Sequence, residues 1–122
     1  MTAKPRILLV DDRAENLTAL EAILSSLNQV LVPVRSGDEA LKALLTGEFA
    51  VILLDVVMPR RNGFQACRDL KSQGRYSNIP VILVTSKTTP SDRFWGEQQG
   101  ANGYVAKPFT PDELLSAVKR FA

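Results

Sequence analysis

Ala50-Val51-Ile52-Leu53-Leu54-Asp55-Val56-Val57-Met58-Pro59 is the stretch of sequence that decides the fold. Five apolar residues run without interruption and then meet one carboxylate, Asp55. A short continuous apolar run is typical of a strand buried on both faces, as in parallel sheets covered by helices. Asp55 then lies at the end of that strand, and ligands of open α/β sheets bind just outside the carboxyl ends of strands. A lone Asp at such a place is more often only a loop starter or a helix cap, so its meaning depends on what the other strands end in.

Further apolar runs alternate with segments of helical spacing along the whole chain. Strands are predicted at 6–10, 30–34, 81–84 and 103–106, and helices at 15–27, 37–46, 64–73, 91–99 and from 111 onward. Because strand and helix alternate about five times, the sequence predicts right-handed βαβ crossovers and a parallel sheet with helices on both faces. Pro33 cannot donate a hydrogen bond to a neighbouring strand, so the strand at 30–34 is expected at a sheet edge.

Some single residues carry structural predictions. Ser36 is expected to cap the second helix, with Glu39 three residues on completing a capping box. The inner face of that helix is expected to extend to Leu45. Cys67 is interpreted as a small core side chain on a helix. Trp95 is left open between a core anchor and a contact for a partner protein.

Length and composition point to one globular domain, which we expect to occupy residues 1–122. The formal net charge is only +2, and no Lys/Arg cluster is longer than Arg60-Arg61, which argues weakly against nucleic acid or a membrane surface as direct partner. No apolar run approaches the roughly 20 residues that a membrane span needs. A single cysteine allows no disulfide framework, so a reducing cytoplasm is the expected location.

The sequence contains no histidine, which limits the chemistry that it can carry. Ser-His-Asp and Cys-His nucleophilic systems are excluded, as is zinc held by histidine. The chain also cannot itself carry a phosphohistidine. Any chemistry must therefore use carboxylates, a lysine, hydroxyls and a hard cation.

The carboxyl ends of parallel strands share one edge of the sheet, and this edge is expected to collect Asp11, Asp12, Asp55, Thr85 and Lys107. Three carboxylates close together repel one another and raise one another's pKa unless a cation lies among them. Mg²⁺ is the common hard cation in such an oxygen cluster. Two carboxylates could hold the ion while the third acts as a nucleophile toward a phosphoryl group. A hydroxyl and a lysine could contact the remaining phosphoryl oxygens.

These residues also carry a resemblance to a known family. The ordered set is Asp11-Asp12, Asp55, Met58-Pro59, Gly63, Thr85, Tyr104 and Lys107-Pro108. With this spacing, the chain resembles the receiver domain of two-component response regulators over nearly its whole length. Parts of it are similar to the chemotaxis response regulator, to stand-alone pilus-motility regulators and to receivers of hybrid kinases. The resemblance implies a flavodoxin-like, doubly wound five-stranded parallel sheet of order 2-1-3-4-5 with five helices.

The resemblance implies that Asp55 is the phosphoacceptor. The phosphoryl group would come from a phosphohistidine on a sensor histidine kinase or a phosphotransfer protein, in a step that needs Mg²⁺. The ion would be held by Asp12, Asp55 and the backbone carbonyl of Val57, and through water by Asp11.

Further implied roles concern the response to phosphorylation. Thr85 and Lys107 would contact the acyl phosphate, with a cis peptide bond between Lys107 and Pro108. Movement of Thr85 would let Tyr104 swing inward and repack the face of the fourth helix, fifth strand and fifth helix. That face would bind a downstream protein target or an output domain, and it allows a phosphorylation-dependent homodimer. Neither nucleic acid nor a membrane is implied as a direct partner.

Two positions depart from common receiver patterns, and two other functions stay open. Val57, two residues after the acceptor, and Lys87, two after Thr85, are expected to hinder an attacking water and to lengthen the life of the phosphorylated form. One alternative is a constitutive interaction or dimerisation module, which would not need the complete set of site residues. The other is a Mg²⁺-dependent aspartyl-phosphate phosphatase, for which the chain lacks an additional acid/base and a cap over the site.

Overall fold

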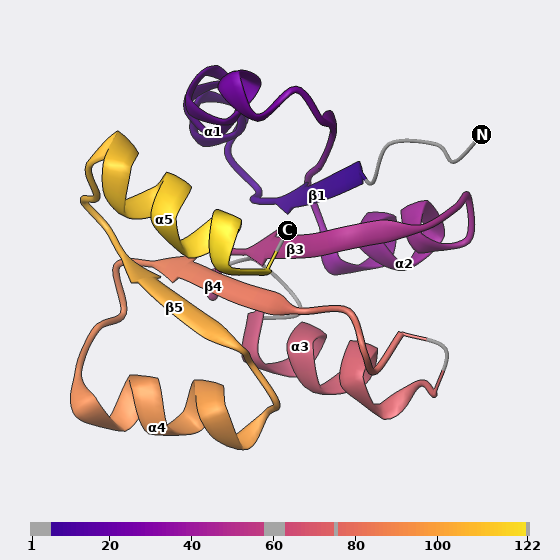
Figure 1. Cartoon of the computed structure of the whole chain (residues 1–122). Helices are drawn as coiled ribbons and strands as arrows, with labels where there is room; N and C mark the ends of the chain where they lie inside the picture. The colour runs from indigo at the N-terminus through magenta and orange to yellow at the C-terminus, as the bar shows by residue number, and fades with distance from the viewer. Residues whose placement is uncertain (1–5, 58–62, 75, 122) are drawn as a thin grey trace.

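The computed structural model describes residues 6–57, 63–74 and 76–121. Its strands are β1 (Arg6–Val10), β2 (Val30–Val34), β3 (Phe49–Leu54), β4 (Val81–Thr85) and β5 (Gly103–Ala106). Its helices are α1 (Ala14–Leu24), the 3-10 turn η1 (Ser25–Leu27), α2 (Gly37–Leu44), α3 (Gly63–Ser72), α4 (Pro90–Gln98) and α5 (Pro111–Phe121). Strands and helices alternate along the chain, as Figure 1 shows. Met58, Pro59 and the Arg60-Arg61 pair lie outside the described residues.

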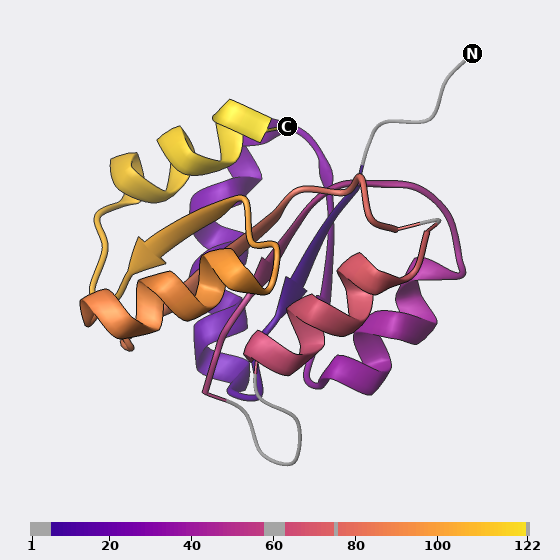
Figure 2. The same cartoon turned by 90° about the horizontal axis from the view of Figure 1, so that it is seen from below.

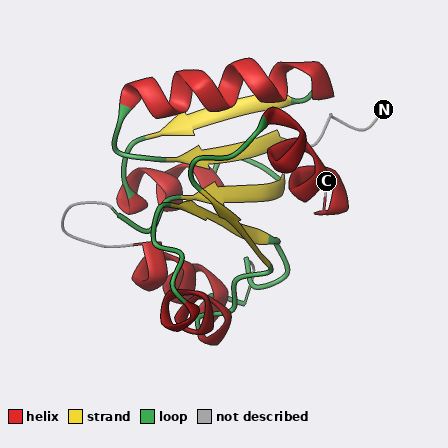
Figure 3. Cartoon of the chain, turned by 90° about the vertical axis from the view of Figure 1, so that its left-hand side faces the viewer, coloured by secondary structure: helices red, strands yellow, loops and turns green. Residues whose placement is uncertain are grey.

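All the strands pair in parallel, in the order β2-β1-β3-β4-β5, which confirms the predicted flavodoxin-like sheet. β2 lies at one edge of the sheet, as predicted, and Pro33 pairs there with Leu9. Because β2 has a neighbouring strand on one side only, the missing N–H of Pro33 interrupts no hydrogen bonding between inner strands. The side view in Figure 3 shows the sheet as a middle layer between two layers of helices.

Each face of the sheet has its own apolar core. One face packs against α1 and α5, through Leu17, Leu20, Leu24, Leu114 and Val118. The other packs against α2 and α3, through Ala40, Leu44, Ala66, Cys67 and Leu70, and Figure 2 shows these two helices with α4 on that side. A fully buried leucine stabilises the fold by about 1.5 to 3 kcal/mol relative to an exposed one, so these two layers hold the strand ends in place. Cys67 is confirmed as a core residue.

The prediction for Leu45 is wrong. α2 ends at Leu44, and the Leu45 side chain is 69% exposed. The N–H of Leu45 bonds to the carbonyl of Lys42, three residues back, so the last turn tightens. This tightening rotates Leu45 off the inner face of the helix.

Trp95 lies on the outer side of α4 with 56% of its surface exposed, so it is not a core anchor. The inner position is taken by its neighbour Gly96, where an added Cβ would lie 2.9 Å from Leu83 and 3.2 Å from the ring of Tyr104. α4 therefore packs closely on β4 and β5. No helix in the described ranges is long and apolar enough to cross a membrane.

Candidate functional site

Three aspartates meet at the carboxyl ends of β1 and β3. Val10 at the end of β1 is in register with Leu54 at the end of β3, and the N–H of Asp55 bonds to the Val10 carbonyl at 3.0 Å. Asp11, Asp12 and Asp55 each present a carboxylate oxygen within 4.8 Å of the others. The structure thus brings together the three acids that the sequence placed at one edge of the sheet.

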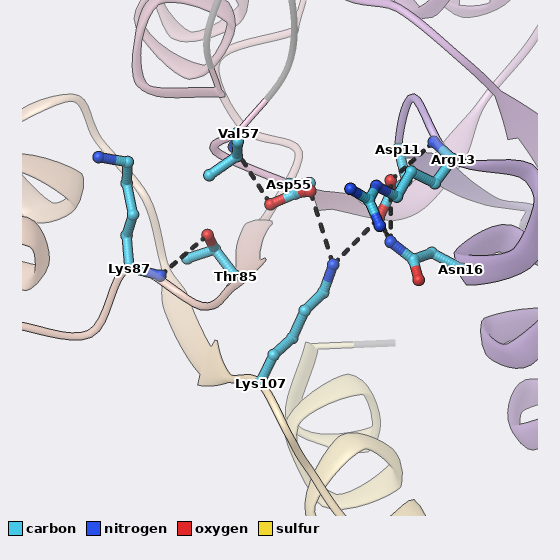
Figure 4. Close-up of polar contacts among 8 residues, drawn as sticks. All are labelled: Asp11, Arg13, Asn16, Asp55, Val57, Thr85, Lys87 and Lys107. Atoms are coloured by element: carbon cyan, nitrogen blue, oxygen red, sulfur yellow. Dashed lines mark hydrogen bonds and ion pairs between the residues drawn. The ribbon is translucent and has the colours of Figure 1, made fainter.

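Lys107 reaches into this cluster from the end of β5. Its Nζ lies 3.1 Å from Oδ2 of Asp11 and 3.5 Å from Oδ2 of Asp55. Figure 4 shows the Lys107 side chain pointing toward both carboxylates. Its backbone N–H bonds to the carbonyl of Thr85 at 2.9 Å, and its peptide bond to Pro108 is cis. One ammonium therefore bridges two of the three carboxylates, and its side chain is 24% exposed.

Asp55 is buried, with 7% of its surface exposed. Burial raises its pKa above the usual value because the charged form loses hydration. The charge of Lys107 is the largest opposing effect, followed by the hydrogen bond that the Val57 N–H donates to Oδ1 at 3.2 Å. The result is a poorly hydrated carboxylate held in one orientation next to a positive charge.

Thr85 ends β4 and is fully buried. Its Oγ1 accepts the N–H of Lys87 at 3.2 Å, and the Tyr104 hydroxyl donates to the carbonyl of Lys87. The guanidinium of Arg93 lies 5.0 Å from the centre of the Tyr104 ring. These contacts join the end of β4 to β5 and α4. The side chain of Lys87 extends away from Asp55 (Figure 4).

Three residues that were not predicted from the sequence lie around the acids in the structure: Arg13, Asn16 and Arg35. The Asn16 amide donates to both oxygens of Asp11, at 3.3 and 3.2 Å, and the Arg13 N–H donates to Oδ1 of Asp11 at 3.0 Å. Arg35 donates to the carbonyl of Asp12. Asn16 could have been found from the sequence, because it is an amide in the first turn of the helix that follows the acidic pair. No sequence signal links Arg35 to Asp12, which precedes it by 23 residues.

A cavity of about 380 Å³ opens over these groups. It is lined by Asp12, Arg13, Asn16, Asp55, Val57, Ser86 and Lys107. A larger cavity of about 480 Å³ lies at the opposite end of the sheet, between the end of α2, the start of β3 and the segment 76–79, and none of the three aspartates lines it. The carboxylates of Asp12 and Asp55 are therefore reached through the smaller one.

The residues of this cavity fit a hard divalent cation. Three carboxylates lie together here, and the positive charges of Lys107 and Arg13 balance only part of their negative charge. Carboxylate and carbonyl oxygens are the ligands that Mg²⁺ prefers, and the open side leaves room for waters that this ion retains.

Comparison with known proteins decides the family. Residues 7–119 match the family described as the response regulator receiver domain. The chain belongs to this family. This receiver domain is 37% identical to Protein PilH of Pseudomonas aeruginosa over 113 residues, which cover 93% of each chain. It spans only about half the length of several transcriptional regulators that it also matches, such as GltR of the same organism.

Two solved structures resemble this receiver domain closely. Chemotaxis protein CheY4 of Vibrio cholerae has a TM-score of 0.91 at 30% identity, with 98% of this chain and 100% of that chain covered. The receiver domain of the sensor histidine kinase PA1611 from Pseudomonas aeruginosa has a TM-score of 0.87 at 34% identity, with 98% of both chains covered. In that structure a magnesium ion is coordinated in the active-site cleft.

Proposed function

We propose that this receiver domain is a phosphorylation-activated signalling switch, in which Asp55 accepts a phosphoryl group from a phosphohistidine. The donor would be a sensor histidine kinase or a phosphotransfer protein. The observation that carries the proposal is the position of Asp55, whose buried carboxylate lies at the floor of an open cavity, 3.5 Å from Lys107 and beside two further carboxylates.

The proposed chemistry is a transfer between two nucleophiles. An oxygen of Asp55 attacks the phosphorus, and a P–O bond forms while the bond from phosphorus to the histidine nitrogen breaks, with its electron pair returning to nitrogen. Lys107 and the hydroxyl of Thr85 would contact the phosphoryl oxygens and stabilise their charge. Attack of water later returns the carboxylate and inorganic phosphate. The domain would thus catalyse only its own phosphorylation and dephosphorylation.

The cation of this step is proposed to be Mg²⁺. Asp12, Asp55 and the backbone carbonyl of Val57 would hold it, with Asp11 acting through a water molecule. When bound, the ion offsets the negative charge of the phosphoryl oxygens. The indirect role of Asp11 is supported by its burial and by the contacts of Asn16 and Lys107, which already bond its carboxylate oxygens.

The output of the switch is proposed to be the face formed by α4, β5 and α5. A shift of Thr85 toward the phosphoryl group would act on Tyr104 through Lys87, which contacts both. Phe94 and Trp95 already lie exposed on α4 and supply apolar surface for a downstream protein or output domain, or for a phosphorylation-dependent homodimer. We also propose that the domain acts in the cytoplasm.

Intact-mass measurement after incubation with acetyl phosphate tests the proposal. We expect one added phosphoryl group with Mg²⁺ present, no addition with a chelator, and no addition in Asp55→Asn. A folded protein that binds Mg²⁺ but gains no mass would instead favour a constitutive interaction module. Steady release of phosphate from many substrates would favour a phosphatase.

A further inference from the structure

We infer that Arg35 is a positioning residue that holds the Asp12–Arg13 peptide so that the Asp12 carboxylate faces the cation site. The inference rests on the proposed function, because it concerns the same Mg²⁺ site. Arg35 follows the edge strand β2, outside the set of strand-end residues at which the chemistry would occur.

The peptide unit between Asp12 and Arg13 is held at both ends. Nε and Nη2 of Arg35 donate to the Asp12 carbonyl oxygen at 3.1 and 2.7 Å. The N–H of the same unit, which belongs to Arg13, donates to Oδ1 of Asp11 at 3.0 Å. The Cα of Asp12 is bonded to this unit, so fixing the plane of the peptide fixes the origin of the Asp12 side chain.

Asp12 depends on this support more than the other two acids do. The carboxylate of Asp11 is bonded by Asn16 and Lys107, and that of Asp55 by Lys107 and the Val57 N–H. Between described residues, no hydrogen bond or ion pair holds the carboxylate of Asp12. Arg13 is the N-cap residue of α1, and its side chain makes no capping hydrogen bond, so no such bond fixes the turn before the helix.

Two sets of backbone contacts place Arg35 beside this turn. Val34 pairs with Val10 in the sheet, and the N–H of Asp11 bonds to the Val34 carbonyl at 3.2 Å, which sets the residue after β2 beside the residues after β1. The N–H of Arg35 bonds to Oε1 of Glu39 at 2.9 Å. Ser36 caps α2 as predicted, but the Glu39 carboxylate thus binds the residue before the cap.

Charge alone predicts the opposite effect of Arg35. A guanidinium near a cation site repels Mg²⁺, so its removal would tighten binding if electrostatics dominated. Positioning predicts weaker binding after removal, although a positive charge is lost. Arg13 supplies the control, because its side chain lines the same cavity while the Asp12 carbonyl is bonded by Arg35.

Calorimetric titration with Mg²⁺ separates the two effects. We expect Arg35→Gln to bind Mg²⁺ about three- to tenfold more weakly than the unmodified protein, the range of one typical hydrogen bond. Arg35→Lys should recover part of the loss, and Arg13→Gln should bind Mg²⁺ more tightly than the unmodified protein, because only a nearby positive charge is removed. Unchanged or tighter binding by Arg35→Gln would overturn the inference.

A metal-free readout keeps the inference separate from the proposed function. In the absence of Mg²⁺, the Arg13 amide proton should exchange with solvent faster in Arg35→Gln than in the unmodified protein, while the amide protons of β4 exchange equally. Equal exchange at Arg13 would overturn the inference even if Mg²⁺ binding changed. Absence of Mg²⁺ binding in the unmodified protein would refute the proposed function, and the exchange rates would still decide whether Arg35 holds the peptide.

Discussion

Nζ of Lys107 lies 3.5 Å from Oδ2 of Asp55, so the chain itself supplies a positive charge next to its buried candidate nucleophile. The contact is longer than the one of 3.1 Å between the same Nζ and Oδ2 of Asp11. It also limits the rise of the Asp55 pKa that burial causes. Lys107 and the metal ion would thus both offset the negative charge of the carboxylates. Their contributions to phosphorylation can be measured separately, because Lys107 can be replaced and the ion can be removed.

Replacing Lys107 by methionine should slow phosphorylation while preserving cation binding. The variant keeps the apolar stem and removes the ammonium, so a charge contact to the phosphoryl oxygens is lost. Such contacts contribute about 1.5 to 3 kcal/mol, which corresponds to roughly a ten- to hundredfold slower reaction with acetyl phosphate. Mg²⁺ should bind at least as tightly, because a competing positive charge is gone. The exposed Lys119 on α5 offers the control, and Lys119→Met should change neither value.

The lifetime of the phosphorylated form should depend on Val57. Its side chain is 50% exposed and lines the cavity over Asp55, where it offers no hydrogen bond to a water. An amide there could orient the attacking water, so Val57→Asn should accelerate loss of the phosphoryl group by about fivefold or more, the effect of roughly one hydrogen bond. Val57→Leu should decay as slowly as the unmodified protein. Equal decay rates in all three proteins would contradict this explanation of the lifetime. Lys87 is not part of the explanation, because its side chain extends away from Asp55 (Figure 4).

Gly63 should tolerate no side chain, because the start of α3 lies directly on the end of β3. A Cβ at Gly63 would collide with the backbone carbonyl of Asp55 and lie 2.6 Å from the Cα of Val56. The backbone of these two buried residues, which directly follow β3, cannot move aside, so we expect Gly63→Ala to lower the free energy of unfolding by about 2 kcal/mol or more. Gly74 has open space around it, and Gly74→Ala should change that free energy by at most about 0.5 kcal/mol. Urea unfolding of both variants decides the matter, and similar stabilities would contradict the packing.

Cys67 should make stability fall at alkaline pH. Its thiol is buried, and burial raises its pKa from 9.0 to about 11, with the charge of Lys71 opposing. Folded and unfolded chains both carry the neutral thiol below pH 9.0, so its contribution is complete there and is lost as the pH rises through about 11. Relative to Cys67→Ala, the unmodified protein should lose about 2 to 3 kcal/mol of unfolding free energy over that range. A difference between the two proteins that does not change with pH would contradict the prediction.

Much of this fold is readable from sequence because its signals are local. The apolar runs, the helical spacing between them and the proline at position 33 predict the sheet, its edge strand and the strand ends at which Asp11, Asp55 and Lys107 meet. Contacts between loops are not readable in this way. The bond from Arg35 to Asp12 depends on the register between β1 and β2, and the exposure of Leu45 depends on where α2 tightens.

The most direct test of the central claim is to locate the phosphorylated residue. The protein would be incubated with acetyl phosphate and Mg²⁺, treated with borohydride, which reduces an aspartyl phosphate to homoserine, and mapped by peptide mass. We predict homoserine at position 55 and nowhere else. Homoserine at Asp11 or Asp12 with Asp55 intact, or a stable phosphoryl group on a hydroxyl side chain, would contradict the account.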